Sequence, residues 1–167
     1  MNKSEDDNLL ITRNNLLNEI NNVSYEEFNY IPEVNSWSIA QVCQHLALTE
    51  ETFAKAIAYG LKKSNACSEP KKIDFILDRS NKLEAPEVVK PQLDSSETFQ
   101  IVDQLNHARN LLNSVLNTVE DTSMLVDKSL KHPVFGDLPL YQWIEILYLH
   151  EQRHIEQIEE IKSHYSV

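Results

Sequence analysis

Residues 150 to 154 read HEQRH, which places two histidines four positions apart with a glutamate directly after the first. On a helix, residues at this spacing lie on one face, so the two imidazoles can bind the same metal ion. In zincin metalloproteases the glutamate of such an HExxH motif is a general base. Two alternatives follow: a zincin peptidase, or a different histidine site that carries a glutamate at its second position.

The third ligand decides between these alternatives, because a catalytic zinc site needs three protein ligands and a position open to water. Gln157 and Glu160 stand where the extended zincin motif has a helix-ending glycine and a further histidine. A glutamate ligand well downstream is not expected either, since the chain ends at Val167 and Glu159 and Glu160 belong to the same predicted helix. The sequence therefore argues against a zincin protease.

His45, about a hundred residues upstream, is the alternative third ligand. At about 100° per residue, six residues of the last predicted helix fall within roughly 40° of one line: Trp143, Leu147, His150, His154, Gln157 and Ile161. His150 and His154 thus point into the protein, and His45 lies on the inner face of another predicted helix. Three inward imidazoles would leave several buried polar atoms seeking partners, which favours a shared metal ion.

Four helices are expected to position these residues. Helical spacing of apolar residues predicts helices over 4–22, from 38 to 60 or 63, from 95 or 96 to about 119, and from Pro139 onwards. The second begins with Ser38 and Gln41 as a capping box. No strand pattern of comparable strength is present, so an all-α, antiparallel four-helix bundle is predicted.

The connections over 64–94 and 120–138 are long for a bundle. The first contains an apolar patch at 73–77, and we expect it to cross an end of the bundle with a short helical piece. The second contains HPVFG at 132–136, a rigid turn with an aromatic residue.

Composition limits the class of protein. The chain has 167 residues, 41% hydrophobic and 25% charged, with two glycines, which is typical of one globular domain over 1–167 rich in helix. A net charge of -11 argues against nucleic acid or a membrane surface as a partner. Cys43 and Cys67 are too far apart for a CxxC site, and the polar N-terminus resembles no signal peptide. A cytoplasmic location is the expectation.

Three stretches also resemble a known family: SWSIAQVCQHL at 36–46, HPVFGDLPLYQW at 132–143 and HEQRHIEQI at 150–158. In this order they are similar to the motifs of the DinB-like superfamily, the DinB/YfiT-like metalloenzymes. The resemblance implies an up-down-down-up four-helix bundle, frequently a homodimer, that binds a divalent metal, commonly zinc or nickel, through His45, His150 and His154. Pro139 departs from the Ser or Thr cap of many relatives, which leaves the ligands unaffected.

The other polar residues near these motifs have simpler interpretations. The resemblance assigns no catalytic role to Glu151, which we expect on a solvated helix face or paired with Arg153, although a base or supporting role beside His150 stays open. Arg153 is expected either to hold the bundle together or to contact an anion near the site. Glu151 and His154 also form an ExxH element of di-iron bundles, but no second ExxH follows and Glu50 lies off the His45 face.

The remaining histidines and cysteines are expected outside the site. His107, His132 and His164 are predicted at the surface or in turns, with His132 able to pack near the open end of the site. Cys43 is predicted as a small core or interface residue, and Cys67 as a thiol in a loop. Trp37 and Trp143 are expected in the core, where either can wall the pocket.

The resemblance implies a metal-dependent enzyme that acts on a small molecule. Transfer of a low-molecular-weight thiol such as bacillithiol or mycothiol to an electrophile is the leading reaction, and metal-dependent hydrolysis is the next. The competing hypothesis is a non-catalytic metal-binding or stress-response bundle.

Overall fold

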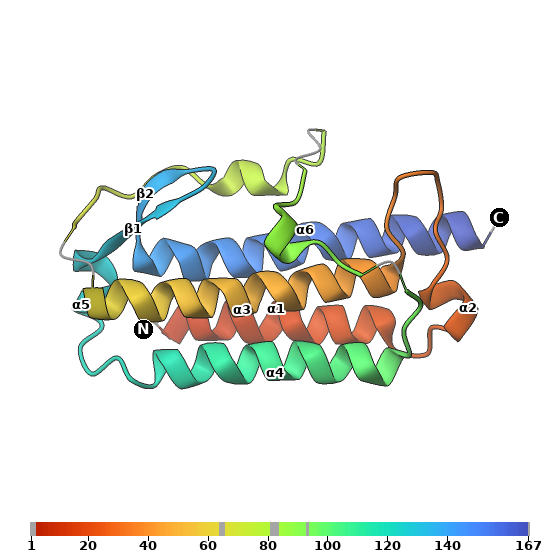
Figure 1. Cartoon of the computed structure of the whole chain (residues 1–167), viewed down its shortest axis with the longest axis horizontal. Coiled ribbons are helices and arrows are strands. Elements are labelled where there is room, and N and C mark those ends of the chain that lie inside the picture. Colours follow the sequence, from red (N-terminus) through yellow and green to blue (C-terminus); the bar gives the residue numbers. More distant parts are fainter. Residues whose placement is uncertain (1–2, 64–65, 81–83, 93, 167) are drawn as a thin grey trace.

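The computed structural model describes residues 3–63, 66–80, 84–92 and 94–166, with side chains from residue 7 onwards. Its four long helices lie side by side along one axis (Figure 1). They are α1 (Lys3–Ile20), α3 (Ile39–Lys63), α4 (Thr98–Leu116) and α6 (Leu140–Tyr165). The predicted four-helix bundle is confirmed. Among the described residues, no helix combines the length and hydropathy that crossing a membrane would need.

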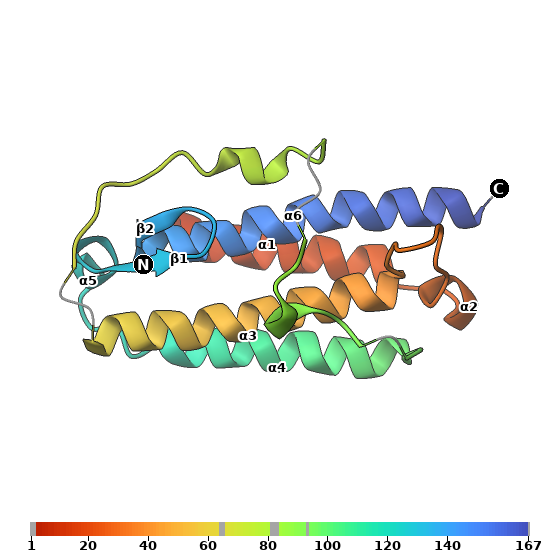
Figure 2. The ribbon, with the colours of Figure 1, turned by 45° about the horizontal axis from the view of Figure 1, so that its top comes forward.

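The helices follow the up-down-down-up order. α1 and α6 run in one direction and α3 and α4 in the other (Figures 1 and 2). α3 packs against both α4 and α6, and α1 packs against α6. Since α3 and α4 are parallel neighbours, the chain must return along the bundle before α4 can begin. The 25 residues of α3 rise about 38 Å, which explains the length of the first connection.

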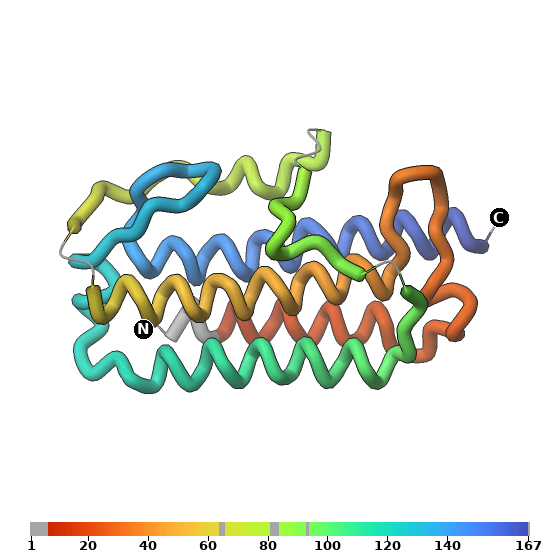
Figure 3. The backbone as a smooth tube through the Cα atoms, in the orientation of Figure 1, coloured from red at the N-terminus to blue at the C-terminus, as the bar shows by residue number. Residues whose placement is uncertain are grey.

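This first connection runs along the side of the bundle (Figure 3). Two 3-10 helices anchor it: η1 (Asp74–Leu77) on α6 and η2 (Glu87–Val89) on α3. The short helical piece predicted at 73–77 is confirmed. The prediction that the connection crosses an end of the bundle is wrong, because it assumed antiparallel neighbours on both sides. Residues 64–65, 81–83 and 93 of the predicted connection lie outside the described residues.

The second connection contains strands that were not predicted. After the short helix α5 (Ser123–Asp127), β1 (Ser129–His132) pairs antiparallel with β2 (Gly136–Pro139). Four-residue strands are too short for an alternating pattern to stand out. Pro139 ends β2 with a ψ of 147°, so α6 begins at Leu140 and Pro139 is its N-cap rather than its first residue. A one-turn helix, α2 (Tyr25–Phe28), was also not predicted.

Side-chain caps set the start of α3 as the sequence indicates. The backbone N–H of Gln41 donates to Ser38 Oγ (3.3 Å), and the N–H of Ser38 donates to Gln41 Oε1 (3.0 Å). These reciprocal bonds form the predicted capping box. At the opposite end of α3, Gly60 allows close packing, since a Cβ there would lie 2.7 Å from Leu140 Cδ2.

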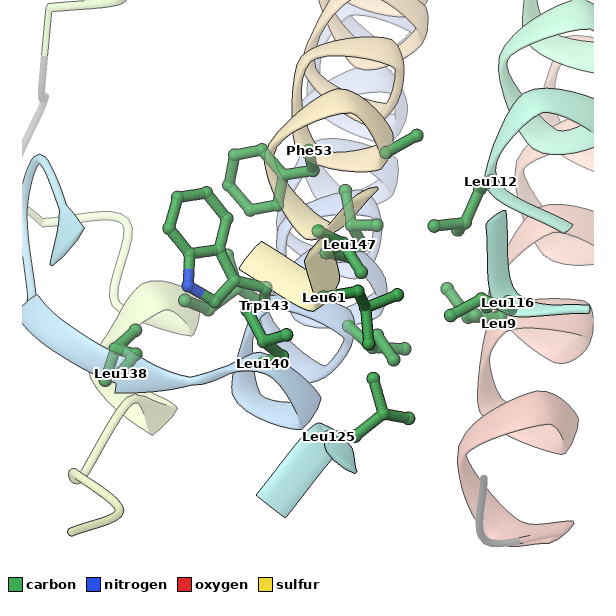
Figure 4. Packing of buried hydrophobic residues seen from close by; sticks show 14 of the residues in the cluster. Leu9, Phe53, Leu61, Leu112, Leu116, Leu125, Leu138, Leu140, Trp143 and Leu147 are labelled. Carbon is green, nitrogen blue, oxygen red and sulfur yellow. The ribbon is translucent and has the colours of Figure 1, made fainter. Parts of the chain in front are cut away.

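The buried side chains form two apolar clusters with a polar layer between them. One cluster, near the start of α6, includes Leu9, Phe53, Leu112, Trp143 and Leu147 (Figure 4). The other includes Leu16, Ala47, Leu105 and Ile158. Along each long helix, a buried or partly buried charged residue separates the two clusters: Arg13, Glu50, Arg109 and Glu151. His150 lies beside these four charged residues, which we call the ion network.

Candidate metal centre

The three predicted histidines meet between α3 and α6. Nε2 of His150 lies 3.3 Å from Nε2 of His45 and 3.1 Å from Nε2 of His154. Their spacing along the helices explains this: His150 and His154 are one turn apart on α6, and His45 faces them from the antiparallel α3. Among the residues that the structure describes, this is the one group of three or more potential metal-ligating side chains.

In His45 and His154, a hydrogen bond at Nδ1 determines which ring nitrogen carries the proton. His45 Nδ1 lies 2.8 Å from the carbonyl oxygen of Val89, and His154 Nδ1 lies 2.8 Å from Gln157 Oε1. Because an oxygen of this kind only accepts, each Nδ1 carries the proton and donates. The lone pairs of both Nε2 atoms therefore point towards His150, as is usual for histidines that bind a metal.

Distance and charge both fit one shared divalent ion. Metal–nitrogen bonds of about 2.0–2.1 Å at tetrahedral angles separate two ligand nitrogens by about 3.3–3.4 Å, close to the spacings here. Burial lowers the pKa of His45 and, with His154 and His45 alongside, holds the pKa of His150 well below its usual range. Burial and the neighbouring His45 lower the pKa of His154 to about 3. All three rings are neutral near pH 7, the form that binds metals, and the arrangement is compatible with metal binding.

The returning connection covers His45. Gln44 Oε1 accepts from the backbone N–H of Gln92 (2.7 Å), and the Gln41 side chain donates to the carbonyl of the same residue (3.3 Å). These bonds hold the segment after η2 on α3, which brings the Val89 carbonyl to His45. Trp37 stacks obliquely on the His45 ring, with centroids 4.9 Å apart, so it does wall the site.

Two buried polar atoms on the helices that carry the histidines have no protein partner among the described residues. Thr49 follows His45 by one turn, and its Oγ1 has no hydrogen-bond partner among the described residues. The same holds for Nε1 of Trp143, which is two turns before His150. Buried polar atoms are normally paired, and unpaired ones are common where a ligand or water binds.

Glu151 does not lie on a solvated helix face, and the predicted surface pair with Arg153 is wrong. Its side chain is 4% exposed. Oε1 accepts from Arg13 Nε (2.7 Å), and Oε2 accepts from the Thr12 hydroxyl (2.6 Å). Glu151 follows His150 by about 100° around α6, which turns it towards α1. Both carboxylate oxygens are therefore already engaged.

Glu50 completes the ion network from α3. It accepts from Arg13 Nη2 and from Arg109 Nε, so each of its oxygens is bound to a guanidinium. Burial alone would lower the pKa of Arg13, but Glu151 and Glu50 raise it above its usual value. Two arginines and two glutamates compensate one another, and they join α1, α3, α4 and α6. These carboxylates are paired with arginine, which argues against the di-iron interpretation.

Comparison with known proteins identifies the family of this chain. The sequence model of the DinB superfamily matches residues 8–158. The chain belongs to the DinB superfamily. It is also 32% identical over 147 residues to "Uncharacterized protein YuaE" of Bacillus subtilis (strain 168), covering 87% of this chain and 90% of that protein.

The fold of this DinB-superfamily chain matches a solved structure. "Crystal structure of TT2238, a four-helix bundle protein" superposes with a TM-score of 0.63 and 15% identity, covering 94% of this chain and 97% of the other. At this identity the likeness shows the fold alone.

Arg153 of this DinB-superfamily protein holds the returning connection rather than facing the histidines. Its Nη1 donates to the carbonyls of Ile76 (2.9 Å) and Asp78. Arg79 in turn donates from Nη1 to the Arg153 carbonyl (3.0 Å). Of the two predicted roles, the structure supports the one of holding the bundle together.

Replacing Arg153 with alanine is expected to loosen the segment around η1 while metal binding persists. The variant loses two hydrogen bonds from a charged donor, each of which contributes at most about 3 kcal/mol. Because these bonds hold the segment on α6, amide hydrogen exchange in residues 73–80 should become faster. Exchange measured by mass spectrometry, beside the exposed control Gln152→Ala, checks this. Unchanged exchange over 73–80 would contradict the assigned role.

His132 of the DinB-superfamily chain was predicted at the surface or in a turn; it lies at the hairpin turn, but its side chain is buried. It is 5% exposed, and its ring packs 4.9 Å from Trp143 and 5.5 Å from Phe53, centroid to centroid. Its Nδ1 accepts from the backbone N–H groups of Val134 and Phe135, which closes the hairpin turn. His107 and His164 are exposed as predicted.

The two cysteines of this family member differ in burial, and we expect them to differ in reactivity. Cys43 is fully buried and Cys67 is exposed. Burial raises the pKa of the Cys43 thiol to about 12, so it stays protonated at pH 8, and the thiolate is the reactive form. We expect a disulfide reagent to modify about one thiol per folded chain and both in denaturant.

Absorbance of the released thiolate measures this thiol count. The folded variant Cys67→Ser should release no thiolate from the reagent, even at pH 10, because this pH is still below the raised pKa of Cys43. Fast modification of folded Cys67→Ser at pH 8 would contradict the assignment.

Proposed function

We propose that this protein is a metal-dependent enzyme in which His45, His150 and His154 hold one divalent ion, zinc or nickel. The observation that supports this most is the convergence of three neutral imidazoles with N–N distances of 3.1 and 3.3 Å. Three protein ligands are typical of catalytic sites, which keep a position open, whereas structural zinc sites usually have four.

The reaction that we propose is transfer of a low-molecular-weight thiol to a small electrophile, with hydrolysis as the next candidate. A divalent ion held by His45, His150 and His154 would supply a Lewis acid that lowers the pKa of a bound thiol or water molecule. Val89 and Gln157 hold the protons of two imidazoles on Nδ1 and so keep the ligands in place. Trp37 shields the His45 ring from solvent, and Thr49 offers a free hydroxyl beside it to orient a bound molecule.

Thiol-dependent consumption of an electrophile tests the proposal. Purified protein is stripped with a chelator, reloaded with zinc, nickel or manganese, and mixed with a bimane-type chloride and bacillithiol. Turnover of the electrophile is expected when metal and thiol are both present. No turnover is expected with metal alone or with thiol alone. The variant His107→Ala, which changes an exposed histidine, is the matched control. A wild-type protein that stays metal-free after all three reconstitutions would contradict the proposal.

One observation favours a second candidate, a non-catalytic metal-binding or stress-response bundle. Within the described part of the chain, the groups nearest to the histidines in sequence are already committed: Glu151 to Arg13 and Thr12, and Arg153 to η1. Cys43 is buried and protonated. Metal binding without turnover of any thiol, electrophile or ester tested would favour this candidate.

The proposal includes a homodimer in the cytoplasm. On α1, Leu10 and Ile11 are 58% and 54% exposed, beside a surface groove of about 380 Å³ between α1 and α6 that none of the three histidines lines. The two free cysteines are in keeping with a reducing compartment. Light scattering of the wild-type protein is expected to give twice the mass of one chain. The variant Ile11→Asn is expected to have a lower mass, because it weakens the dimer.

A further inference from the structure

The three histidines differ in how their second nitrogen is held. Nδ1 of His45 and of His154 each have an oxygen acceptor at 2.8 Å. For His150, the hydrogen bonds of the described residues include none to Nδ1. Since its Nε2 faces the other two imidazoles, a metal bound there would leave the ring proton on Nδ1, and this N–H would need an acceptor.

A small cavity lies between His150 and the ion network. Its volume is about 10 Å³, the lower limit for about one water molecule. It is lined by His150, by the four residues of the ion network, and by Leu46 and Leu147. Five of these seven residues carry polar side chains, and a buried water needs two to four polar partners.

The ion network has acceptor capacity left for such a water. A carboxylate offers about four acceptor positions. Glu50 accepts one N–H on each oxygen, and Glu151 accepts from Arg13 on one oxygen and from Thr12 on the other. With two of about four positions used, each carboxylate can accept about two hydrogen bonds more.

We propose that one buried water fills this cavity and links Nδ1 of His150 to a carboxylate oxygen of Glu50 or Glu151. The ion network would then orient the His150 imidazole through this water. Val89 and Gln157 orient the imidazoles of His45 and His154 by direct hydrogen bonds. Only the positioning role rests on the proposed function, because a metal ion on Nε2 would fix the His150 proton on Nδ1, whereas a water can bind Nδ1 as donor or acceptor in either tautomer. Such a link gives Glu151 a positioning role and no part in catalysis as a base.

The position of the water can be tested without metal. A high-resolution crystal structure of the metal-free wild-type protein should contain one ordered water within hydrogen-bond distance of His150 Nδ1 and of one network carboxylate. A cavity without water would overturn the inference. This result is independent of whether the protein binds metal, so failure of the proposed function remains distinguishable.

The variant Leu46→Met tests the effect of the water on metal binding. Methionine has about the volume of leucine but reaches one atom further from the backbone, so it extends into the cavity from its apolar wall without changing charge, and such swaps usually cost less than about 1.5 kcal/mol. With the water displaced, zinc affinity measured by calorimetry is expected to fall about 10–100-fold, as for the loss of other groups that orient a ligand. Leu112→Met, buried in the other apolar cluster, is the matched control and should keep wild-type affinity.

A spectroscopic measurement separates positioning from a merely structural effect. In ¹⁵N-histidine spectra of the zinc-loaded protein, the Nδ1–H proton of His150 should be visible in wild type and exchange faster in Leu46→Met. Of Glu50→Gln and Glu151→Gln, the variant that weakens zinc binding while folded identifies the carboxylate. Wild-type zinc affinity in Leu46→Met with the water displaced would overturn the link, whereas glutamine at position 50 or 151 keeps an accepting oxygen and tests only the contribution of the charge.

Discussion

Replacing His154 with alanine is expected to abolish stable zinc binding while the bundle stays folded. The change removes one of three converging Nε2 atoms, 3.1 Å from its neighbour on His150. The loss in affinity should exceed the roughly 10–100-fold cost of losing a group that merely orients a ligand. His154 belongs to neither apolar cluster, so both clusters keep their contacts in the variant. Metal content after dialysis and calorimetric titration with zinc measure the effect.

The exposed histidine at position 107 provides the control for this prediction. His107→Ala should bind zinc like wild type, and both should gain stability with metal, by about 2.7 kcal/mol at a free concentration of 100 times Kd. His154→Ala should gain none. The prediction fails if His154→Ala binds zinc with wild-type affinity.

The helices and the three histidines could be predicted because both depend on local spacing. Apolar residues at helical intervals define which face of a helix is buried, and His45, His150 and His154 lie on those faces. Ser38 and Gln41 likewise act within one turn, and the structure has the capping box that they predict. A pattern confined to one helix therefore predicts structure without knowledge of which helix packs against it.

The place of Glu151 could not be predicted in this way, because it depends on a different helix. Its position, about 100° from His150, is solvated or buried according to where α1 lies. One signal was present: Arg13 interrupts the apolar spacing of the first helix at a position that should be buried. A buried guanidinium needs carboxylate partners, so Arg13 indicated that inward carboxylates existed, although their identity required the packing of four helices.

The returning connection shows the same limit. Its length was visible in the sequence, but a long connection can cross an end of a bundle or run along its side. The parallel arrangement of α3 and α4 decides this, and that is a property of the tertiary packing. The Val89 carbonyl reaches His45 only because of this route, so this acceptor could not be named beforehand.

Replacing Arg13 with methionine is expected to be the most destabilising single change in the polar layer. Arg13 donates to both buried glutamates and, from Nη1, to the carbonyl of Leu105 (2.8 Å). Methionine fills much of the same space but leaves two buried carboxylates facing one remaining guanidinium. Removing one partner of a buried ion pair costs about 3–5 kcal/mol. Urea unfolding measures the loss.

A surface ion pair from the same helix as Glu50 is the control. Lys55 lies 3.4 Å from Glu51, and its side chain is 69% exposed, so Lys55→Met should change stability by less than about 0.5–1 kcal/mol. The double variant Arg13→Met with Glu151→Gln restores the charge balance, since one glutamate then faces Arg109. If uncompensated charge causes the loss, this double variant should be more stable than Arg13→Met alone by at least about 1 kcal/mol. A double variant that loses the sum of both single effects would instead mean that packing, and not charge balance, holds the polar layer together.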